Sequence, residues 1–412
     1  MSDDFPIFWT EAVGANVLDV DGNVYLDLTA GFGVAASGHR NPRVVEAIRM
    51  QLETLVHGLG DVHPPDIKVQ LLERLATVAP AGLDCSILTS SGAEAVEAAL
   101  KTARIASGRP GVLSFSGAYH GLTYGALAVT DGEFFRGPFE DQLGIPVARA
   151  AFPDPYRPAL ELEGESDLCR AALALVAARL DAEADLIGAV IVEPIQGRAG
   201  IVVPPDGFLT GLREICDRRG LVLIFDEILT GFGRTGRWFA CQHEGVLPDL
   251  LCVGKALSGA LPFSACIGRP GVMAAWPSSA GAAIHTSTFL GHPLACAAAL
   301  AQIEEIEKLD LVARSARLGA YVLERLESLR PRFRAIGNVR GRGLLAALDL
   351  VSDPATREPS PQRAQRLVME ALRRGLILLA EGGAVTLSPP LTISEEQLDF
   401  ALTTLEDCLG NA

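Results

Sequence analysis

The feature that most constrains the fold is an alternation of short apolar segments with longer amphipathic ones from about residue 66 onward. The short segments resemble strands that are buried on both faces, and the longer ones carry apolar residues at helical spacing. We expect strands over 85–89, 112–115, 187–194, 221–228 and 250–254, and helices over 67–78, 93–106, 167–179 and 208–218. This order predicts an α/β fold with a doubly wound, mostly parallel sheet.

The two ends of the chain have a different pattern. Residues 16–28 alternate on either side of Asp21-Gly22, which predicts a hairpin, and Asn41-Pro42 predicts the start of a helix. Long helices and short strands follow from about residue 294, with elements expected at 293–308, 311–329, 344–350, 362–374 and after a capping box at 394–397. We therefore expect a large domain over 61–293 and a smaller α+β domain built from 1–60 and 294–412.

Composition excludes several classes of protein. The net charge of −15 argues against nucleic acid, which requires a clustered basic surface. No apolar segment approaches the roughly 20 residues of a membrane span, and the first 17 residues lack the pattern of a signal peptide. The eight cysteines are scattered, without a C-x-x-C pair, which favours reduced thiols in the cytoplasm over disulfides or a metal site.

Two familiar motifs are misleading here. Residues 231–236 fit G-x-G-x-x-G after a strand, but the segment that follows lacks the helical periodicity that a dinucleotide site requires. Residues 221–227 resemble the acidic strand of an ATPase, but the chain has no G-x-x-x-x-G-K-[ST] loop to hold phosphates. We expect neither site.

A lysine and an aspartate stand at the ends of neighbouring apolar strands. Asp226 ends one strand, where open α/β sheets bind ligands, and alone it fits a solvated turn equally well. Lys255, one of only four lysines, ends the next strand between small residues. Burial there would lower its pKa and make it an amine nucleophile, whereas the alternative is a lysine that extends to solvent.

A third element is the start of the helix expected at 93–106. Ser91 can cap this helix and Glu94 can close a capping box, while the amides of Gly92 and Ala93 form an anion site. An ordinary capped helix explains this segment equally well. Taken together, however, a Schiff-base lysine, an acidic partner for a pyridine nitrogen and a phosphate cradle are what pyridoxal 5'-phosphate (PLP) requires.

Nearly the whole chain resembles the class III (ornithine/4-aminobutyrate type) PLP-dependent aminotransferases of fold type I. The resemblance is carried by SSGAEAVEAALKTAR, GAYHG, VEPIQG, LIFDEILTGFGRTG, LPDLLCVGKALSGALPFSA, HTSTFLGHPLACAAALA and LSPPLTIS. It implies a homodimer with active sites at the subunit interface.

The resemblance also implies roles for individual residues. Lys255 would carry the cofactor and act as acid and base, and Asp226 would keep the pyridine nitrogen protonated. Tyr119 and Ile228 would cover the two ring faces, although core packing explains either residue alone. The other cofactor contacts implied are Ser91, Gly92, Ala93, His120, Glu193 and, for the partner subunit's phosphate, Thr288.

The departures from the family concern the substrate, whose expected contacts are Phe32, Leu122, Glu193 and Thr386. Leu122 and Thr386 occupy positions where relatives carry arginines that bind carboxylates, and Leu229 replaces a frequent glutamine. Glu193, without its usual arginine, should take a proton or meet a cation, which favours a donor with a cationic or hydroxylated distal end. Arg198 either binds a carboxylate instead or is a solvent-facing loop residue.

Three functions fit these residues. The first is transfer of an amino group from a primary amine or amino acid to a 2-oxo acid. The second is a racemase or epimerase of the same fold, since some racemases resembling this family also lack the arginines. A binding protein without catalysis is the third, and it would have no use for Lys255 opposite Asp226.

Overall fold

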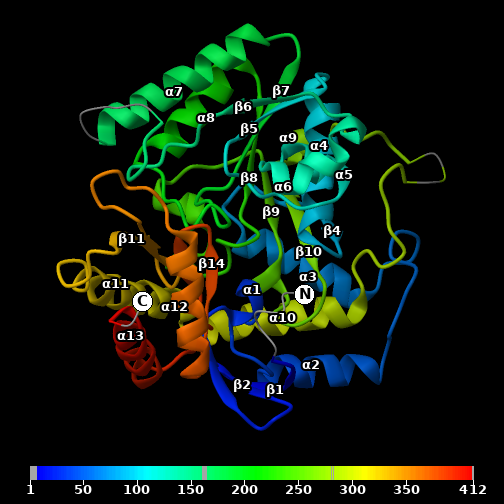
Figure 1. Ribbon diagram of the computed structural model, residues 1–412. Coiled ribbons are helices and arrows are strands. Elements are labelled where there is room, and N and C mark those ends of the chain that lie inside the picture. The colour runs from blue at the N-terminus through cyan, green and yellow to red at the C-terminus, as the bar shows by residue number, and fades with distance from the viewer. Residues whose placement is uncertain (1–6, 160–164, 280, 282, 411–412) are drawn as a thin grey trace.

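A computed structural model describes residues 7–159, 165–279, 281 and 283–410. Its centre is a seven-stranded sheet in the order β4-β10-β9-β8-β7-β5-β6 (Figure 1). The strands are β4 (Cys85–Thr89), β5 (Gly111–Phe115), β6 (Val147–Ala150), β7 (Ile187–Val192), β8 (Val222–Asp226), β9 (Leu250–Val253) and β10 (Ser264–Gly268). The pairings from β9 to β6 are parallel, which confirms the predicted α/β sheet.

Two strands of this sheet are not predicted by the sequence. β10 runs antiparallel to both β4 and β9, and β6 forms an edge beside β5. Their sequences, SACIG and VARA, contain small or charged residues and therefore lack the apolar run by which the other strands are recognised.

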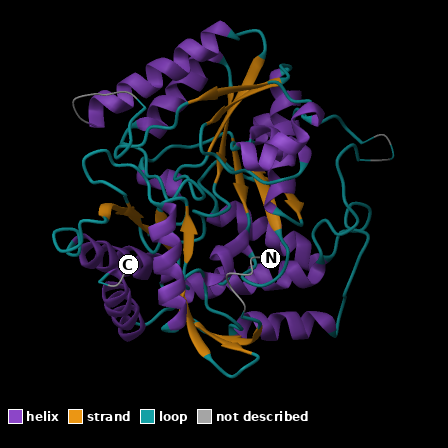
Figure 2. Ribbon diagram, viewed as in Figure 1, coloured by secondary structure: helices purple, strands orange, loops and turns teal. Residues whose placement is uncertain are grey.

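Helices cover both faces of the sheet, as the doubly wound prediction requires (Figure 2). Alternate strand residues enter different apolar clusters: Ile224 packs in the cluster that includes α4, whereas Phe225 packs with α8. The helices of this part are α3 (Asp66–Val78), α4 (Gly92–Ser107), α5 (Tyr124–Val129), α6 (Glu133–Arg136), α7 (Glu165–Ala182), α8 (Phe208–Arg219) and α9 (Pro270–Met273), with short 3-10 turns η1 (Gly137–Gln142), η2 (Ala240–His243) and η3 (Lys255–Leu257). Residues 231–236 lead into turns and then η2, so they do not open a dinucleotide-binding helix.

Two smaller sheets combine the ends of the chain. One is antiparallel, in the order β11-β12-β15-β14, and the other joins the hairpin β1-β2-β3 to β13. Their strands are β1 (Trp9–Val13), β2 (Asn16–Asp19), β3 (Val24–Asp27), β11 (Ile336–Gly341), β12 (Ala346–Leu350), β13 (Leu376–Ile377), β14 (Leu379–Glu381) and β15 (Ala384–Leu387). Because β3 pairs with β13, the two chain ends are physically joined, although the domain limits at 60/61 and 293/294 remain our prediction.

Apart from α1, a single turn that the sequence does not predict, the helices near the chain ends lie close to the predicted positions. They are α1 (Ala30–Gly33), α2 (Pro42–Leu52), α10 (Pro293–Lys308), α11 (Leu311–Glu327), α12 (Pro361–Arg373) and α13 (Glu395–Leu409). Asn41 caps α2 by accepting from the amides of Arg43 and Val44, and Ser394 and Gln397 form the predicted capping box of α13. α10 packs against α2, α3 and α11.

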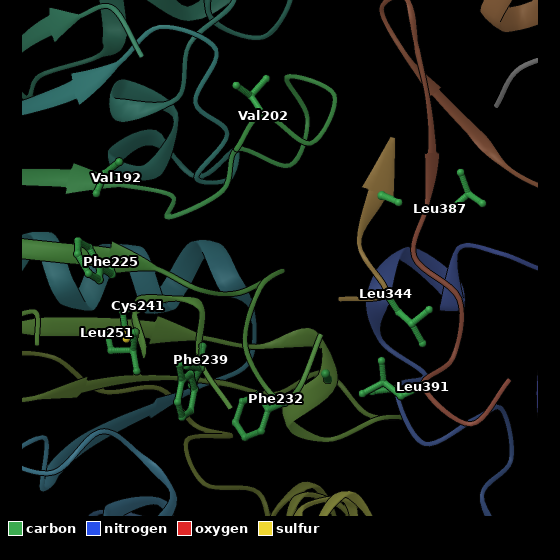
Figure 3. Packing of buried hydrophobic residues seen from close by; sticks show 14 of the residues in the cluster. Val192, Val202, Phe225, Phe232, Phe239, Cys241, Leu251, Leu344, Leu387 and Leu391 are labelled. Carbon is green, nitrogen blue, oxygen red and sulfur yellow. The ribbon is translucent and has the colours of Figure 1, made fainter. Parts of the chain in front are cut away.

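One apolar cluster links the central sheet to the C-terminal part (Figure 3). It runs from Phe225 of β8 through Phe232 and Phe239 to Leu387 of β15. The segment after β8 therefore fills the space between the two parts. The carboxyl ends of β8 and β9 lie at this junction, where ligands of parallel sheets bind.

None of the helices in the described ranges combines the length and the apolar character that a membrane span needs.

Candidate active site

A cavity of about 320 Å³ lies at the carboxyl ends of β8 and β9, a size typical of small-molecule sites. Lys255 lines it from the turn after β9. The turn is tight, because Lys255 has a φ of 44° and a Cβ on Gly254 would lie 2.6 Å from Ser264 Oγ. Among the described residues, the Lys255 amine has no hydrogen bond or ion pair. Burial lowers the pKa of Lys255, against the opposing carboxylates of Asp226 and Glu193, and this favours the nucleophilic neutral amine.

Asp226, the last residue of β8, is held in the same cavity by two hydrogen bonds. One carboxylate oxygen lies 2.7 Å from Nδ1 of His120, and the other accepts from the Ile228 amide at 3.1 Å. Both side chains are almost completely buried. Nε2 of His120 has no hydrogen-bond partner in the described part of the chain. The pair therefore presents a fixed carboxylate in a site largely closed to water, which suits a pyridine N–H.

The start of α4 forms one wall of the cavity. Ser91 caps this helix, as predicted, by accepting from the Glu94 amide at 3.3 Å. The predicted capping box is wrong in one respect: the Glu94 carboxylate accepts from the Ser90 amide instead of the Ser91 amide, because it reaches back one residue further. Gly92 and Ala93 both line the cavity at this positive helix end. A Cβ on Gly92 would lie 2.9 Å from Ile228 Cδ1, so a larger residue at this position would require Ile228 or the helix start to shift.

Tyr119 and Ile228 also line the cavity, from the segments that follow β5 and β8. Ile228 packs with the apolar cluster around α4, and Tyr119 has Phe135 at a ring-centroid distance of 5.5 Å. An aromatic ring and a β-branched side chain in one narrow cavity suit the two faces of a planar ligand.

Glu193 follows β7 and is buried in the cavity wall. Its two carboxylate oxygens accept from the amides of Tyr119 at 2.8 Å and Gly197 at 2.7 Å. Burial raises its pKa to about 7, although His120 and the two amides oppose the shift. No cation forms an ion pair with Glu193 among the described residues. Because no cation of the described residues pairs with it, Glu193 can take up either a proton or the cationic end of a ligand, the two outcomes expected from the sequence.

Arg198 also lines the cavity, and the sequence left its position open. Its guanidinium lies 5.1 Å from the centroid of the Tyr119 ring and 3.4 Å from a carboxylate oxygen of Glu381 in β14. Burial raises the pKa of Glu381, and Arg198 and Lys255 oppose that shift. No local sequence pattern points to Glu381, because β14 is remote in the chain and its contact with Arg198 follows from tertiary packing alone.

The remaining predicted residues lie at different places. Leu122 lines the cavity and is 51% exposed, whereas Thr386 is buried in β15 and its hydroxyl faces the Leu379 carbonyl at 3.4 Å. Phe32 is 60% exposed and does not line the cavity, although a Cβ on its neighbour Gly33 would lie 3.8 Å from Lys255 Cδ. Thr288 is exposed on the loop before α10 and is also outside the cavity. Within the described residues, no cluster of histidine, cysteine, aspartate and glutamate is arranged to bind a metal.

Comparison with known proteins matches this chain to one family. The model of "Aminotransferase class-III" matches residues 1–409. A 4-aminobutyrate aminotransferase from Mycobacterium leprae is 39% identical, over 98% of this chain and 91% of that protein. A leucine/methionine racemase from Thermococcus litoralis is 37% identical over the same shares. An amine transaminase from an uncultivated Pseudomonas species, solved in its PLP-bound form, has a TM-score of 0.94 and 33% identity over 99% of this chain and 95% of that one.

The residues of the cavity fit PLP, the cofactor of this family. The Lys255 amine, which has no partner among the described residues, and the fixed carboxylate of Asp226 lie in one cavity with a helix start that can accept a phosphate. The fold, the cavity and the whole-chain matches agree, and the chain belongs to the class III aminotransferase family of PLP-dependent enzymes.

Proposed function

We propose that this aminotransferase moves an amino group from a primary amine or amino acid with a cationic or hydroxylated distal end to a 2-oxo acid. One observation carries the donor specificity: the buried carboxylate of Glu193 accepts from two backbone amides in the cavity wall, and no cation of the described residues pairs with it. Leu122 and Thr386 replace two arginines expected from the family, so a donor with a distal carboxylate loses charge-assisted hydrogen bonds worth about 1.5–3 kcal/mol each.

When bound, PLP supplies a ring that takes up the electron pair left as the amine carbon loses its proton. Lys255 would hold the cofactor as a Schiff base and, once released, move the proton at the substrate carbon. Asp226, fixed by His120, would accept a hydrogen bond from the pyridine N–H. The amides of Gly92 and Ala93 would hold the phosphate, and Tyr119 would pack on the ring.

The assignment of Lys255 has a direct test. Borohydride should fix the cofactor irreversibly on one lysine, and peptide mapping should find the label on Lys255. A label on Lys68, Lys101 or Lys308 would refute it.

The proposal includes a homodimer in which Thr288 contacts the phosphate of the partner subunit, and it places the enzyme in the cytoplasm. Thr288 itself is exposed on the loop before α10, and this exposure supports such a contact. The eight free cysteines are compatible with a reducing compartment.

A racemase is the second candidate, because one relative bears the name leucine/methionine racemase. Single-turnover experiments separate the two functions. An aminotransferase converts the enzyme to its pyridoxamine form with one equivalent of donor and releases an oxo product. A racemase exchanges the α-proton with solvent and keeps the amino group on the substrate.

A donor screen tests the specificity. We expect kcat/KM for diamines, lysine and ornithine to exceed that for 4-aminobutyrate, with uncharged amines as the reference. If 4-aminobutyrate is preferred by tenfold or more, about 1.4 kcal/mol, the proposed donor class is wrong.

A further inference from the structure

Arg198 is the one arginine among the residues that line the cavity. It belongs to a short loop, 197–201, that follows β7 and is closed at its base by Gln196 and Val202, whose backbones exchange two hydrogen bonds of 2.9 and 3.0 Å. The loop base is thus fixed to the protein, while the Arg198 side chain is 42% exposed. A guanidinium at this place combines a defined position with access to small molecules that enter the cavity.

The contacts of Arg198 leave most of its N–H groups without an acceptor among the described residues. Its guanidinium lies 5.1 Å from the Tyr119 ring centroid and 5.6 Å from that of Phe135, so the aromatic rings hold it by cation–π contacts. Such contacts use the cation and not its N–H groups. Within the described residues Arg198 makes no hydrogen bond, and its one ion pair is the contact with Glu381 at 3.4 Å.

The ion pair between Arg157 and Asp349 has a closer geometry than the pair between Arg198 and Glu381. Arg157 donates two hydrogen bonds of 2.7 Å to both carboxylate oxygens of Asp349, in the bidentate arrangement that arginine prefers. Arg198 and Glu381 approach through one nitrogen and one oxygen at a longer distance. The Arg198–Glu381 pair is therefore weakly engaged, and another carboxylate can form the bidentate contact that Glu381 does not.

Glu381 is suited to release Arg198. It is 19% exposed, and burial raises its pKa, so the side chain can take up a proton when its cation is occupied. Exchanging one carboxylate for another at Arg198 keeps the local charge balanced. A substrate without a carboxylate leaves the Arg198–Glu381 pair in place, so neither charge is left unpaired at the cavity.

We propose that Arg198 binds the carboxylate of the 2-oxo acid acceptor. When an amine without a carboxylate is bound, Arg198 pairs with Glu381 instead. This assignment rests on the proposed transfer of an amino group to a 2-oxo acid. The Arg198 guanidinium would thus bind a substrate that has a carboxylate, and Glu381 would neutralise this guanidinium when the substrate has none. Arg198 is thus a specificity-determining residue for the acceptor, and Glu381 acts through it as a positioning residue.

Binding without turnover provides the first test. Borohydride reduction blocks the reaction, and calorimetry then measures the affinity of the reduced holoenzyme for pyruvate. We expect Arg198→Gln to weaken binding at least tenfold and Glu381→Gln to strengthen it, because the competing carboxylate is gone. Arg237→Gln, at an exposed arginine outside the cavity, should leave the affinity unchanged.

A double mutant separates this role from a structural one. If Glu381 acts only through Arg198, then Glu381→Gln should have no effect on pyruvate affinity in the Arg198→Gln background. Half-reactions add a second readout: Arg198→Gln should lower kcat/KM for pyruvate at least tenfold relative to that for 1-phenylethylamine, which has no carboxylate.

Three results would overturn the assignment: no binding of pyruvate to the reduced wild type, an Arg198→Gln affinity within twofold of wild type, or weaker binding by Glu381→Gln. The proposed function fails on a different result, namely that no amine converts the wild type to its pyridoxamine form. Arg198-dependent binding of pyruvate without such conversion would retain the carboxylate site and reject aminotransfer.

Discussion

Two carboxylates line one cavity in different settings. Asp226 has a histidine partner at 2.7 Å, whereas Glu193 has two backbone amides and no cation among the described residues. The histidine fixes Asp226 in place for a ligand N–H. Glu193, with a pKa raised to about 7 by burial, changes its charge close to neutral pH. Glu193 therefore suits a role that varies with pH.

Replacement of Asp226 by alanine should remove the anion that stabilises a protonated pyridine nitrogen. We expect kcat to fall by about 10²–10³, the range found for single preorganised electrostatic groups. The cofactor should still bind through its phosphate, and its absorbance provides the control for folding and occupancy. Near-normal turnover by cofactor-loaded Asp226→Ala would exclude the role.

Glu193 should make the stability of the cofactor-free protein depend on pH. Its folded pKa of about 7 exceeds the ordinary 4.5, so the folded state binds more protons between these values and the free energy of unfolding falls as pH rises through them. The shift corresponds to about 3 kcal/mol. Denaturant titrations at pH 5 and 8 should show a larger loss for wild type than for Glu193→Gln, and equal losses would contradict the raised pKa.

At the residue scale, the sequence identifies groups that lie next to strand ends or helix starts. Lys255, Asp226 and Gly92 follow directly from such positions and meet in one cavity. Glu381 and the bonds of Glu193 to the amides of Tyr119 and Gly197 depend on how distant segments pack, and no local pattern encodes them. Thr386 is expected to contact the substrate because of its position in relatives. In the structure it lies in β15, and its hydroxyl faces a backbone carbonyl.

At the scale of elements, the site depends on the close approach of α4 to the segment after β8. A Cβ on Gly92 would lie 2.9 Å from Ile228 Cδ1, so an added methyl group must displace Ile228 or the helix start. We expect Gly92→Ala to weaken PLP binding by about tenfold, or 1.4 kcal/mol, as followed by absorbance during reconstitution. Gly144→Ala, where a Cβ meets nothing within 4 Å, is the matched control. Unchanged affinity in Gly92→Ala would show that the cradle tolerates the methyl group.

The sequence predicts these elements unequally well. Long amphipathic helices and uniformly apolar strands are recognised with small errors at their ends, as α10 and β9 show. β10, with the sequence SACIG, contains small residues and is paired on both sides, with β4 and with β9. Its antiparallel direction follows from the short connection after Lys255, a constraint of topology that residue patterns do not express.

At the scale of the whole molecule, the proposed dimer predicts a shared site. Thr288→Val chains and Lys255→Ala chains should each form inactive or weakly active homodimers. If Thr288 serves the partner's phosphate, hybrid dimers contain one intact site, with Lys255 from the first chain and Thr288 from the second. We expect hybrids purified by two affinity tags to reach about half of wild-type activity per dimer, a value set by the one intact site of two.

Absence of rescue in the hybrids would assign Thr288 to its own subunit. Light scattering on the active wild type provides the independent check, since a catalytically active monomer would reject the dimer altogether.

The loop closed by Gln196 and Val202 also affects how this enzyme can change. Its base is fixed by backbone hydrogen bonds, which do not depend on the side chains within the loop. Replacing the side chain of Arg198 therefore leaves the strand, the cavity floor and the apolar cluster intact. Random mutagenesis confined to this position and to Glu381 should yield folded variants with new acceptor preferences, and natural drift at these two positions offers a short route from one substrate to another.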